Sequence, residues 1–313
     1  MSSKRLETKS NKTHHSLHGT LEKAVADLEV KIRERGDLPS VSVDEQIAVL
    51  QDLIQFPLGR FIVEKKGANG FWTDYMITFP ETRRKTGRNI EGKPLSKWED
   101  FLVNRSPVVL ASQERYKIFQ RTAQSLIKDG VVLASIPCGV MNDLLTLDYS
   151  NVANFKLIGI DIDKESIDLA KKQAEAKNSR SVEFRIQNAW ELEDQNSFDV
   201  ITSSGLNVYE DDIEKVLELY RQFYRALKPG GVLITSVLTY PPGEGKKTDW
   251  DLTGMSEETL RMEQILHKEI LGVKWRNFCS INEIELQFMK AGFSKVDVIL
   301  DRRRIFPTVI AYK

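Results

Sequence analysis

Residues 131–163 constrain the fold of this chain more than any other segment. A short, apolar and β-branched run over 131–136 ends at Pro137-Cys138-Gly139, and a second apolar run over 156–161 ends on the carboxylate of Asp161. A strand, a tight turn, a helix and a second strand that ends in an acidic residue is how a nucleotide-binding α/β sheet begins. The sequence therefore predicts a sheet whose first turn and second strand contact a bound cofactor.

Strands and helices alternate through the rest of this half of the chain. Further strands are predicted at 182–186, 198–202 and 232–238. The clearest helix spans 211–228, where apolar residues recur at helical spacing. Such alternation predicts an α/β fold with a doubly wound, mostly parallel sheet. The last two strands, 295–301 and 305–312, are separated by three arginines only, so they must pair as an antiparallel hairpin.

The first 125 residues have a different character. Segments 20–35, 42–54 and 112–128 show the spacing of amphipathic helices, and the second follows a capping-box pattern. The stretch 67–75 between them is rich in glycine and aromatic residues. We divide the chain into a flexible tail (1–18), a helical N-terminal cap (19–125) and a cofactor-binding domain (126–313) with a lid-like insertion at 243–279.

Composition argues against several classes of protein. Lys+Arg and Asp+Glu both number 45, so the net charge is zero and nothing global favours nucleic acid or an anionic membrane. Two cysteines are too few for a disulfide framework or a zinc site. No run of 18 apolar residues predicts a membrane helix. We expect a cytoplasmic protein without a metal, and export by an unrecognised signal stays open. The basic triplet 302–304 is interpreted as a solvated hairpin tip.

Five segments in the second half of the chain occur in an informative order. They are Ile136-Pro-Cys-Gly139, Gly159-Ile-Asp161-Ile-Asp163, Gln187-Asn-Ala-Trp190, Phe198-Asp-Val-Ile-Thr-Ser-Ser204 and Leu227-Lys-Pro-Gly-Gly231-Val-Leu-Ile234. Together they resemble the class I S-adenosylmethionine-dependent methyltransferases, whose seven-stranded sheet also ends with an antiparallel strand. The resemblance covers roughly residues 126–313. It implies an enzyme that uses S-adenosylmethionine and releases S-adenosylhomocysteine.

The first of these segments departs from the family's pattern. The family shows an acidic residue followed by Gly-x-Gly-x-Gly, whereas this chain has Ser135, Pro137 and Met141 at the acidic, first and third glycine positions. Proline has no N–H and a fixed φ, so either fewer backbone donors face the cofactor or Asp143 supplies a displaced carboxylate. Cys138 is interpreted as a small, unreactive thiol.

The resemblance also implies which residues contact the cofactor. A carboxylate at a strand end can accept hydrogen bonds from both ribose hydroxyls, so Asp161 is assigned to the ribose, and Asp163 is better placed as a helix N-cap. Asn188 and Ala189 resemble the family's adenine contacts, and Trp190 packs either on the adenine or in the core. The expected cofactor residues are Pro137, Cys138, Gly139, Asp143, Asp161, Ile162, Asn188, Ala189, Ser203, Ser204 and Trp72.

The acceptor side has weaker signals. The candidate residues there are Asn207, Tyr209, Tyr240 and Tyr75. Packing between the helical part and the sheet explains each of them equally well, and the stretch 67–75 is a candidate lid. We name no general base, because a carboxylate acceptor needs none whereas a hydroxyl or an amine must lose a proton.

We expect in-line methyl transfer to a small molecule, in which the protein mainly positions the donor and the acceptor. Neutral charge disfavours nucleic acid, as does Ser204-Gly-Leu-Asn-Val where many amino-methylating nucleic-acid enzymes have Asn/Asp-Pro-Pro-Tyr/Phe. A protein acceptor, and a binding protein that kept the fold and lost catalysis, remain alternatives. A nicotinamide oxidoreductase needs three glycines in the first turn, and aminopropyl transfer needs a carboxylate pair that 202–205 lacks. The oligomeric state stays open.

Overall fold

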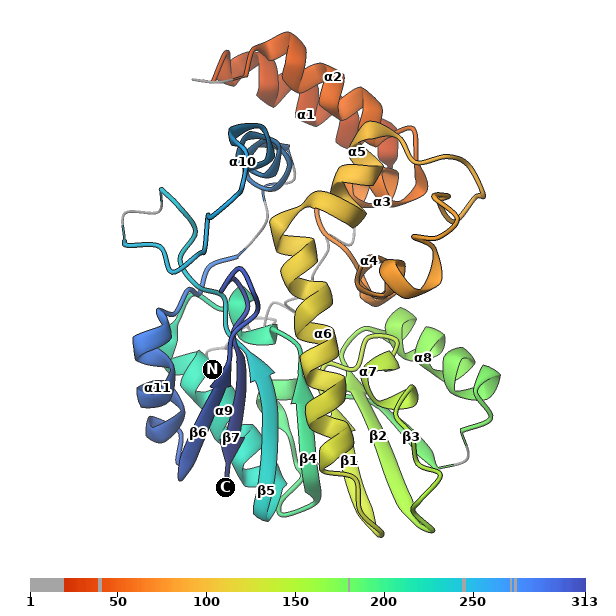
Figure 1. The fold of residues 1–313 in the computed structure, drawn as a ribbon, viewed down its shortest axis with the longest axis vertical. Coiled ribbons are helices and arrows are strands. Elements are labelled where there is room, and N and C mark those ends of the chain that lie inside the picture. The colour runs from red at the N-terminus through yellow and green to blue at the C-terminus, as the bar shows by residue number, and fades with distance from the viewer. Residues whose placement is uncertain (1–19, 39–40, 180, 244–245, 271, 273–274) are drawn as a thin grey trace, which may run out of the picture.

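A seven-stranded sheet forms the centre of the protein. The computed structural model describes residues 20–38, 41–179, 181–243, 246–270, 272 and 275–313. The strands are β1 (Val131–Ser135), β2 (Phe155–Asp161), β3 (Val182–Ile186), β4 (Phe198–Ser203), β5 (Leu227–Ser236), β6 (Lys295–Ile299) and β7 (Thr308–Tyr312). Their order is β3-β2-β1-β4-β5-β7-β6, and β7 runs antiparallel to both of its neighbours (Figure 1). The predicted doubly wound sheet with a terminal hairpin is confirmed.

Helices cover both faces of the sheet. One face carries α6 (Pro107–Ser125), α7 (Asn142–Leu145) and α8 (Lys164–Ala176), and the other carries α9 (Ile213–Ala226) and α11 (Ile284–Lys290). Successive strand residues point to opposite faces, so Leu233 packs in the cluster with α9 while Ile234 packs in the cluster with α6. The stripe of α9 buries Val216, Tyr220 and Phe223 completely, because these residues recur at helical spacing.

One carboxylate organises the turn between β6 and β7. Asp301, which is 1 % exposed, accepts hydrogen bonds from the backbone N–H groups of Ile305 at 3.2 Å and Phe306 at 2.7 Å. Arg303 donates to the carbonyl of Asp251 at 3.1 Å, so the triplet predicted to be a solvated tip is anchored at its middle residue. Pro307 directly precedes β7, which agrees with the rule that proline avoids the interior of a sheet.

The N-terminal helices and the insertion after β5 pack together. The helical elements are α1 (Leu21–Arg35), α2 (Val43–Leu53), α3 (Pro57–Lys65), α4 (Gly70–Thr82), α5 (Lys97–Asp100), the π-helical η1 (Phe101–Arg105), α10 (Glu257–Gln264) and the π-helical η4 (Ile265–Ile270). Met262, Ile265 and Leu266 of the insertion join the apolar cluster of α1–α4 (Figure 1). The chain therefore returns from the sheet to the N-terminal helices. The predicted tail, 1–18, lies outside the described residues.

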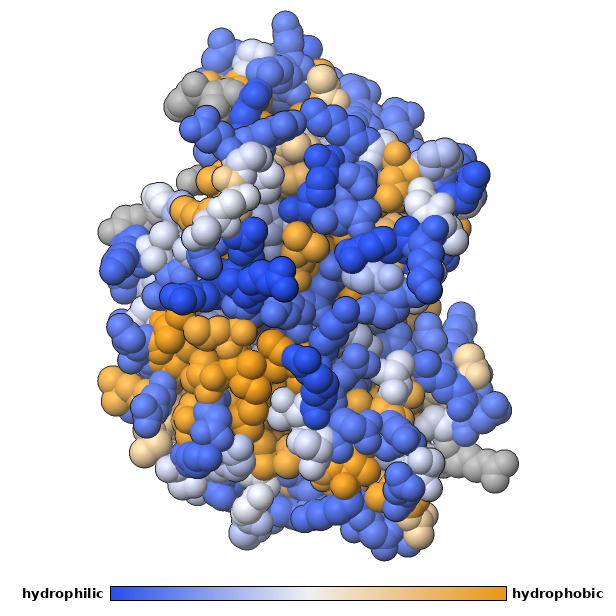
Figure 2. All heavy atoms as spheres, viewed as in Figure 1, coloured by the Kyte–Doolittle hydropathy of each residue, from blue (hydrophilic) through white to orange (hydrophobic). Residues whose placement is uncertain are grey.

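The outer end of the sheet is less covered than its centre. Hydrophobic residues gather over β5, β7 and β6 on the face shown in Figure 2. Ile299 of β6 pairs with Thr308 and is 39 % exposed. Within the described residues, no helix is both long and apolar enough to span a membrane.

Gly159 in β2 offers a test of sheet packing. An added Cβ would lie 2.6 Å from Cδ1 of Phe184 on β3 and 3.1 Å from the sulfur of Met141. Overpacking of this kind costs about 1–3 kcal/mol, so Gly159→Ala should lower the free energy of unfolding by that amount in urea denaturation. Ile186→Ala is the control, because Ile186 is 58 % exposed and its loss should change stability by less than about 0.5 kcal/mol. Equal stability of the two variants would contradict the packing described.

Candidate functional site

The carboxyl ends of the central strands meet at a cavity of about 610 Å³. Ligands bind at this edge in open α/β sheets, and the volume lies within the range of about 300–1,000 Å³ that is typical of ligand pockets. Most of the residues expected to contact a cofactor line it. They are Pro137, Cys138, Gly139, Asp143, Asp161, Ile162, Asn188, Ala189 and Ser204.

Asp161 connects the first turn to the end of β2. Its Oδ2 accepts the N–H of Gly139 at 2.9 Å, and its Oδ1 accepts the N–H of Asp163 at 3.0 Å. The residue is 8 % exposed, and burial raises the pKa of its carboxyl group. A carboxylate offers about four lone-pair sites, so Asp161 can also accept a hydrogen bond from a ligand in the cavity. Asp163 accepts the N–H groups of Glu165 and Ser166, as predicted for an N-cap.

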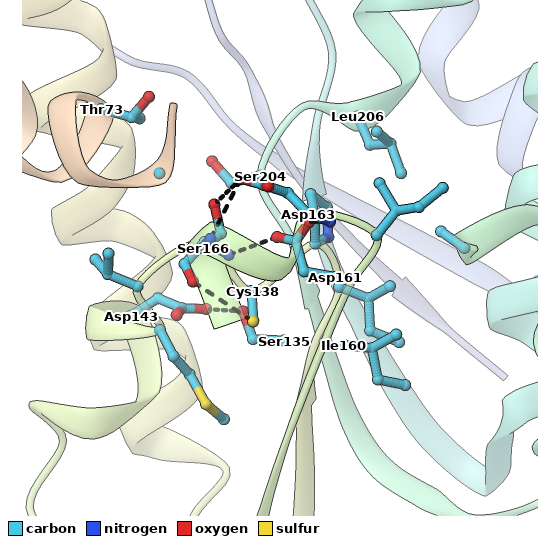
Figure 3. A pocket seen from close by; sticks show the side chains of 18 of the residues that line it. Thr73, Ser135, Cys138, Asp143, Ile160, Asp161, Asp163, Ser166, Ser204 and Leu206 are labelled. Atoms are coloured by element: carbon cyan, nitrogen blue, oxygen red, sulfur yellow. Dashed lines mark hydrogen bonds between the residues drawn. The ribbon is translucent and has the colours of Figure 1, made fainter. Parts of the chain in front are cut away.

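A second carboxylate lies at the end of β1. The Oδ2 atom of Asp143 accepts a hydrogen bond from the hydroxyl of Ser135 at 2.9 Å (Figure 3). It also accepts one from the hydroxyl of Thr202 at 2.6 Å. Burial raises the pKa of Asp143. Ser135 occupies the position where the family pattern has an acidic residue, so the geometry agrees with a carboxylate displaced from that position to Asp143.

Helix α4 lies against the first turn. A Cβ added to Gly70 would lie 2.9 Å from the Cα of Gly139, so the two backbones are in contact at a distance that only glycine permits. The amide of Asn142 donates to Asp74 of α4 at 2.8 Å. Burial and the charge of Asp143 raise the pKa of Asp74. Three carboxyl groups with raised pKa values thus surround one end of the cavity.

Only one face of α4 contributes to the cavity. Gly70, Thr73, Asp74 and Ile77 line it, at the spacing i, i+3, i+4, i+7 that defines a helix face. Trp72 and Tyr75 belong to the opposite face and pack in the core of the N-terminal helices, with their ring centroids 5.4 Å apart. Burial raises the pKa of Tyr75 to about 12. The structure therefore places the expected cofactor residue Trp72 and the acceptor candidate Tyr75 outside the cavity lining.

Four other expected residues do not line the cavity. They are Ser203, Asn207, Tyr209 and Tyr240. Ser203 and Asn207 are each 1 % exposed. Burial raises the pKa of Tyr209, which a hydrogen bond with Trp275 partly offsets. The hydroxyl of Tyr240 accepts a hydrogen bond from Lys246 at 2.8 Å. The positions of these four side chains agree with the alternative role considered for them, which is packing between parts of the protein.

Helix α6 supplies cavity residues that sequence reasoning did not select. Ser112, Arg115, Tyr116 and Phe119 line the cavity at the same i, i+3, i+4, i+7 spacing as in α4. Only the apolar positions of this helix were used to predict it. The available signal was the polar pair Ser112 and Arg115, which are three residues apart and lie beside the apolar stripe. Whether these side chains face a cavity, however, depends on how α6 packs on the sheet.

The opposite end of the cavity is formed by Trp190 and α9. The indole N–H of Trp190 donates to the carbonyl of Lys215 at 2.9 Å. Trp190 lines the cavity and also packs against the apolar cluster of α9. Trp190 therefore forms part of the cavity wall and also contacts the apolar core.

The described residues include no group of three or more His, Cys, Asp and Glu side chains arranged to hold a metal ion. Burial raises the pKa of the Cys138 thiol well above its usual value, so the thiolate form is disfavoured. The chemistry available in the cavity lining is that of carboxylates, hydroxyls, amides, a thiol, one ammonium and one guanidinium.

The sequence matches known methyltransferases. Residues 127–278 match a family model described as a methyltransferase domain. Demethylmenaquinone methyltransferase of Lactococcus lactis is 25 % identical over 175 residues, which are 54 % of this chain and 68 % of the relative. Ribosomal protein L11 methyltransferase of Dictyoglomus thermophilum is 27 % identical over 146 residues, which are 47 % of this chain and 44 % of the relative.

A solved structure extends the similarity to the N-terminal helices. This crystal structure, of a possible exported protein from Bordetella parapertussis, is 35 % identical, covers 94 % of this chain and 95 % of its own, and has a TM-score of 0.84. The sheet topology, the family model and the named relatives agree with one another. The chain belongs to the class I S-adenosylmethionine-dependent methyltransferases and is an enzyme of that family.

Proposed function

We propose that this enzyme transfers a methyl group from S-adenosylmethionine to a small-molecule acceptor, with the cofactor bound in the cavity at the ends of β1–β4. The position of Asp161 carries the proposal. Its carboxylate lines the cavity at the end of β2 and keeps lone pairs available beyond its two backbone bonds. A ribose diol offers two donors to such a group.

The chemistry of the lining fits the rest of the cofactor. Asn188 and Ala189 follow β3 and form the wall near Trp190, where an adenine ring would find both polar and aromatic contacts. Asp143 and Asp74 form an acidic end suited to the ammonium group of the methionine part. No side chain lies between Gly70 and Gly139, so α4 closes directly over this turn.

Bound S-adenosylmethionine supplies a methyl group that is already electrophilic, because it is attached to a sulfonium. The residues of the chain orient the two substrates and exclude water. The inward faces of α4 and α6 serve this purpose. We propose that the helices of 19–125 and the insertion at 243–279 act together as a cap on the sheet of the 126–313 domain.

A small acceptor agrees with a cavity enclosed between two helices and a sheet. One relative described above is named for demethylmenaquinone, a small molecule, and the other for ribosomal protein L11. A protein acceptor is therefore the second candidate. The cytoplasmic location and the absence of nucleic-acid binding stay predictions.

Cofactor binding is tested by thermal unfolding with added ligands. A ligand at 100 times its dissociation constant stabilises the folded protein by about 2.7 kcal/mol. S-adenosylhomocysteine should raise the unfolding temperature with saturation, and NAD should not. A shift with neither ligand would favour a protein that kept the fold and lost cofactor binding. A radiolabelled-methyl screen of metabolite and protein extracts then distinguishes the two acceptor classes.

Substitution of Asp161 tests the ribose assignment. Asp161→Asn keeps the size but replaces an acceptor oxygen with a donor, so S-adenosylhomocysteine should bind roughly 10- to 100-fold more weakly, the equivalent of about 1.5–3 kcal/mol. Loss of one backbone bond should also lower stability. The control is Asp212→Asn, because Asp212 caps α9 by accepting the N–H of Glu214 at 3.0 Å and does not line the cavity. Calorimetry that finds equal affinity for the two variants would refute the assignment.

Asp143→Asn tests the burial of the second carboxylate. Burial raises the pKa of Asp143 above the usual 3.8, so its contribution to stability is present at low pH and is lost as pH rises through the raised pKa. The asparagine variant should gain stability relative to the parent as the pH rises above 3.8, measured by urea denaturation at several pH values. Asp148→Asn should show no such gain, because hydrogen bonds from Ser150 lower the pKa of Asp148. A flat difference for Asp143→Asn would show that the group is solvated.

A further inference from the structure

Arg115 is a buried cation in the wall of the cavity. It is 8 % exposed, and its Nη1 donates to the hydroxyl of Ser236, the last residue of β5, at 3.2 Å. The guanidinium carbon lies 4.6 Å from the ring centroid of Phe306, just before β7. Nη1 also lies 3.4 Å from the position of a Cβ added to Gly205, after β4. The guanidinium is thus held above the ends of β4, β5 and β7.

The positive charge of Arg115 has no carboxylate partner in the part of the chain that the structure describes. None of the ion pairs found there includes it, and Ser236 is the one hydrogen-bond acceptor found for its side chain. The nearby Asp301 is committed to the backbone of the β6–β7 turn. Burial lowers the pKa of Arg115 only to about 10, so it stays charged at neutral pH. An unpaired buried charge is costly, and one that faces a cavity is compensated when an anion binds.

The sheet order separates Arg115 from the proposed cofactor contacts. Asp161 and Asn188 follow β2 and β3, on one side of β1, whereas β4, β5 and β7 lie on the other side. Ser204 and Leu206, which follow β4, line the cavity between the two ends. Arg115 therefore faces the part of the cavity left for the methyl acceptor. A cation there would repel a sulfonium unless an anion lay between them.

We propose that Arg115 binds a carboxylate group of the methyl acceptor, an inference that rests on the proposed function. The planar guanidinium suits a carboxylate, with which it forms paired hydrogen bonds. Ile77, Phe119 and Leu206 also line the cavity, so the acceptor is a monocarboxylate with an apolar body. A phosphate is disfavoured by its larger charge, because seven acidic side chains line the cavity against two basic ones. The acidic ones are Asp74, Asp143, Asp161, Asp163, Glu191, Glu210 and Glu218.

The test compares charged and neutral probes of the same shape. Benzoate and hexanoate, and their amides benzamide and hexanamide, are titrated into the parent protein with and without saturating S-adenosylhomocysteine, and binding is followed by thermal shift. The carboxylates should stabilise the parent with saturation and the amides should not. Arg115→Gln should bind the carboxylates roughly 30-fold or more weakly, as for other buried charge pairs that lose one partner, and Arg115→Lys should retain part of the affinity.

Calorimetry with S-adenosylhomocysteine separates this proposal from its alternatives. The affinity of Arg115→Gln for this ligand should stay within about threefold of the parent. A tenfold loss would assign Arg115 to the cofactor's own carboxylate and overturn the proposal. The proposal would also be overturned if the parent bound carboxylates and amides equally well, or if it bound neither. Arg121→Gln is the matched control, since Arg121 is exposed on the same helix. The preference for carboxylates over amides is also measured without S-adenosylhomocysteine, so the two proposals are tested separately. Failure of the parent to bind S-adenosylhomocysteine would count against the proposed function.

Discussion

The two backbone hydrogen bonds to Asp161 determine how the rest of the site is arranged. They join the turn after β1 to the turn after β2, at 2.9 Å from Gly139 and 3.0 Å from Asp163. The N–H of Gly139 is consumed in this way, and Pro137 has none to offer. The first turn therefore presents fewer backbone donors to a ligand than a glycine-rich turn does. The carboxylates of Asp161 and Asp143 offer acceptors to the same cavity instead.

The close contact of α4 with this turn follows from the same arrangement. The lack of a side chain at both glycines lets the backbone at Gly70 approach Gly139. Thr73 and Asp74 of the same helix then line the cavity. Its aromatic residues face away and join the apolar cluster that also holds Met262 of α10. One face of α4 thus packs in the core of the N-terminal helices, and the other face lines the cavity.

The parts of the fold that the sequence predicted are those with strong local patterns. β3 was predicted at its observed bounds, because Val-Glu-Phe-Arg-Ile alternates apolar and charged residues, which is typical of a strand. The Lys-Pro-Gly-Gly turn was expected to separate a helix from a strand, yet β5 begins at Leu227 and includes it. The aromatic and glycine-rich pattern at 67–75 predicts neither a helix nor a strand. It contains the start of α4, capped by Asn69, whose side chain accepts the N–H of Trp72 at 3.0 Å.

The same distinction holds for the site. Residues at strand ends, such as Asp161 and Asn188, could be predicted, because a parallel sheet brings those ends to one edge. Arg115 and Asp74 could not, since their contribution depends on how two helices of the cap lie on the sheet. Sequence reasoning chose Trp72 and Tyr75 for their chemistry, but helix α4 directs them into the core, where their burial stabilises the cap.

Local charge is more informative than the total. The chain has no net charge, and this argued against nucleic acid only weakly, since a basic face can exist on a neutral protein. The cavity lining is strongly acidic, with Arg115 as a buried exception at one end. Such a lining repels a phosphate backbone directly and favours a cationic ligand beside Asp143 and Asp74. A cationic ligand would be attracted by Asp143 and Asp74, and an anionic ligand by Arg115. The two ligands would also attract each other. The two proposals together would therefore place the cationic cofactor and the anionic acceptor at opposite ends of one cavity.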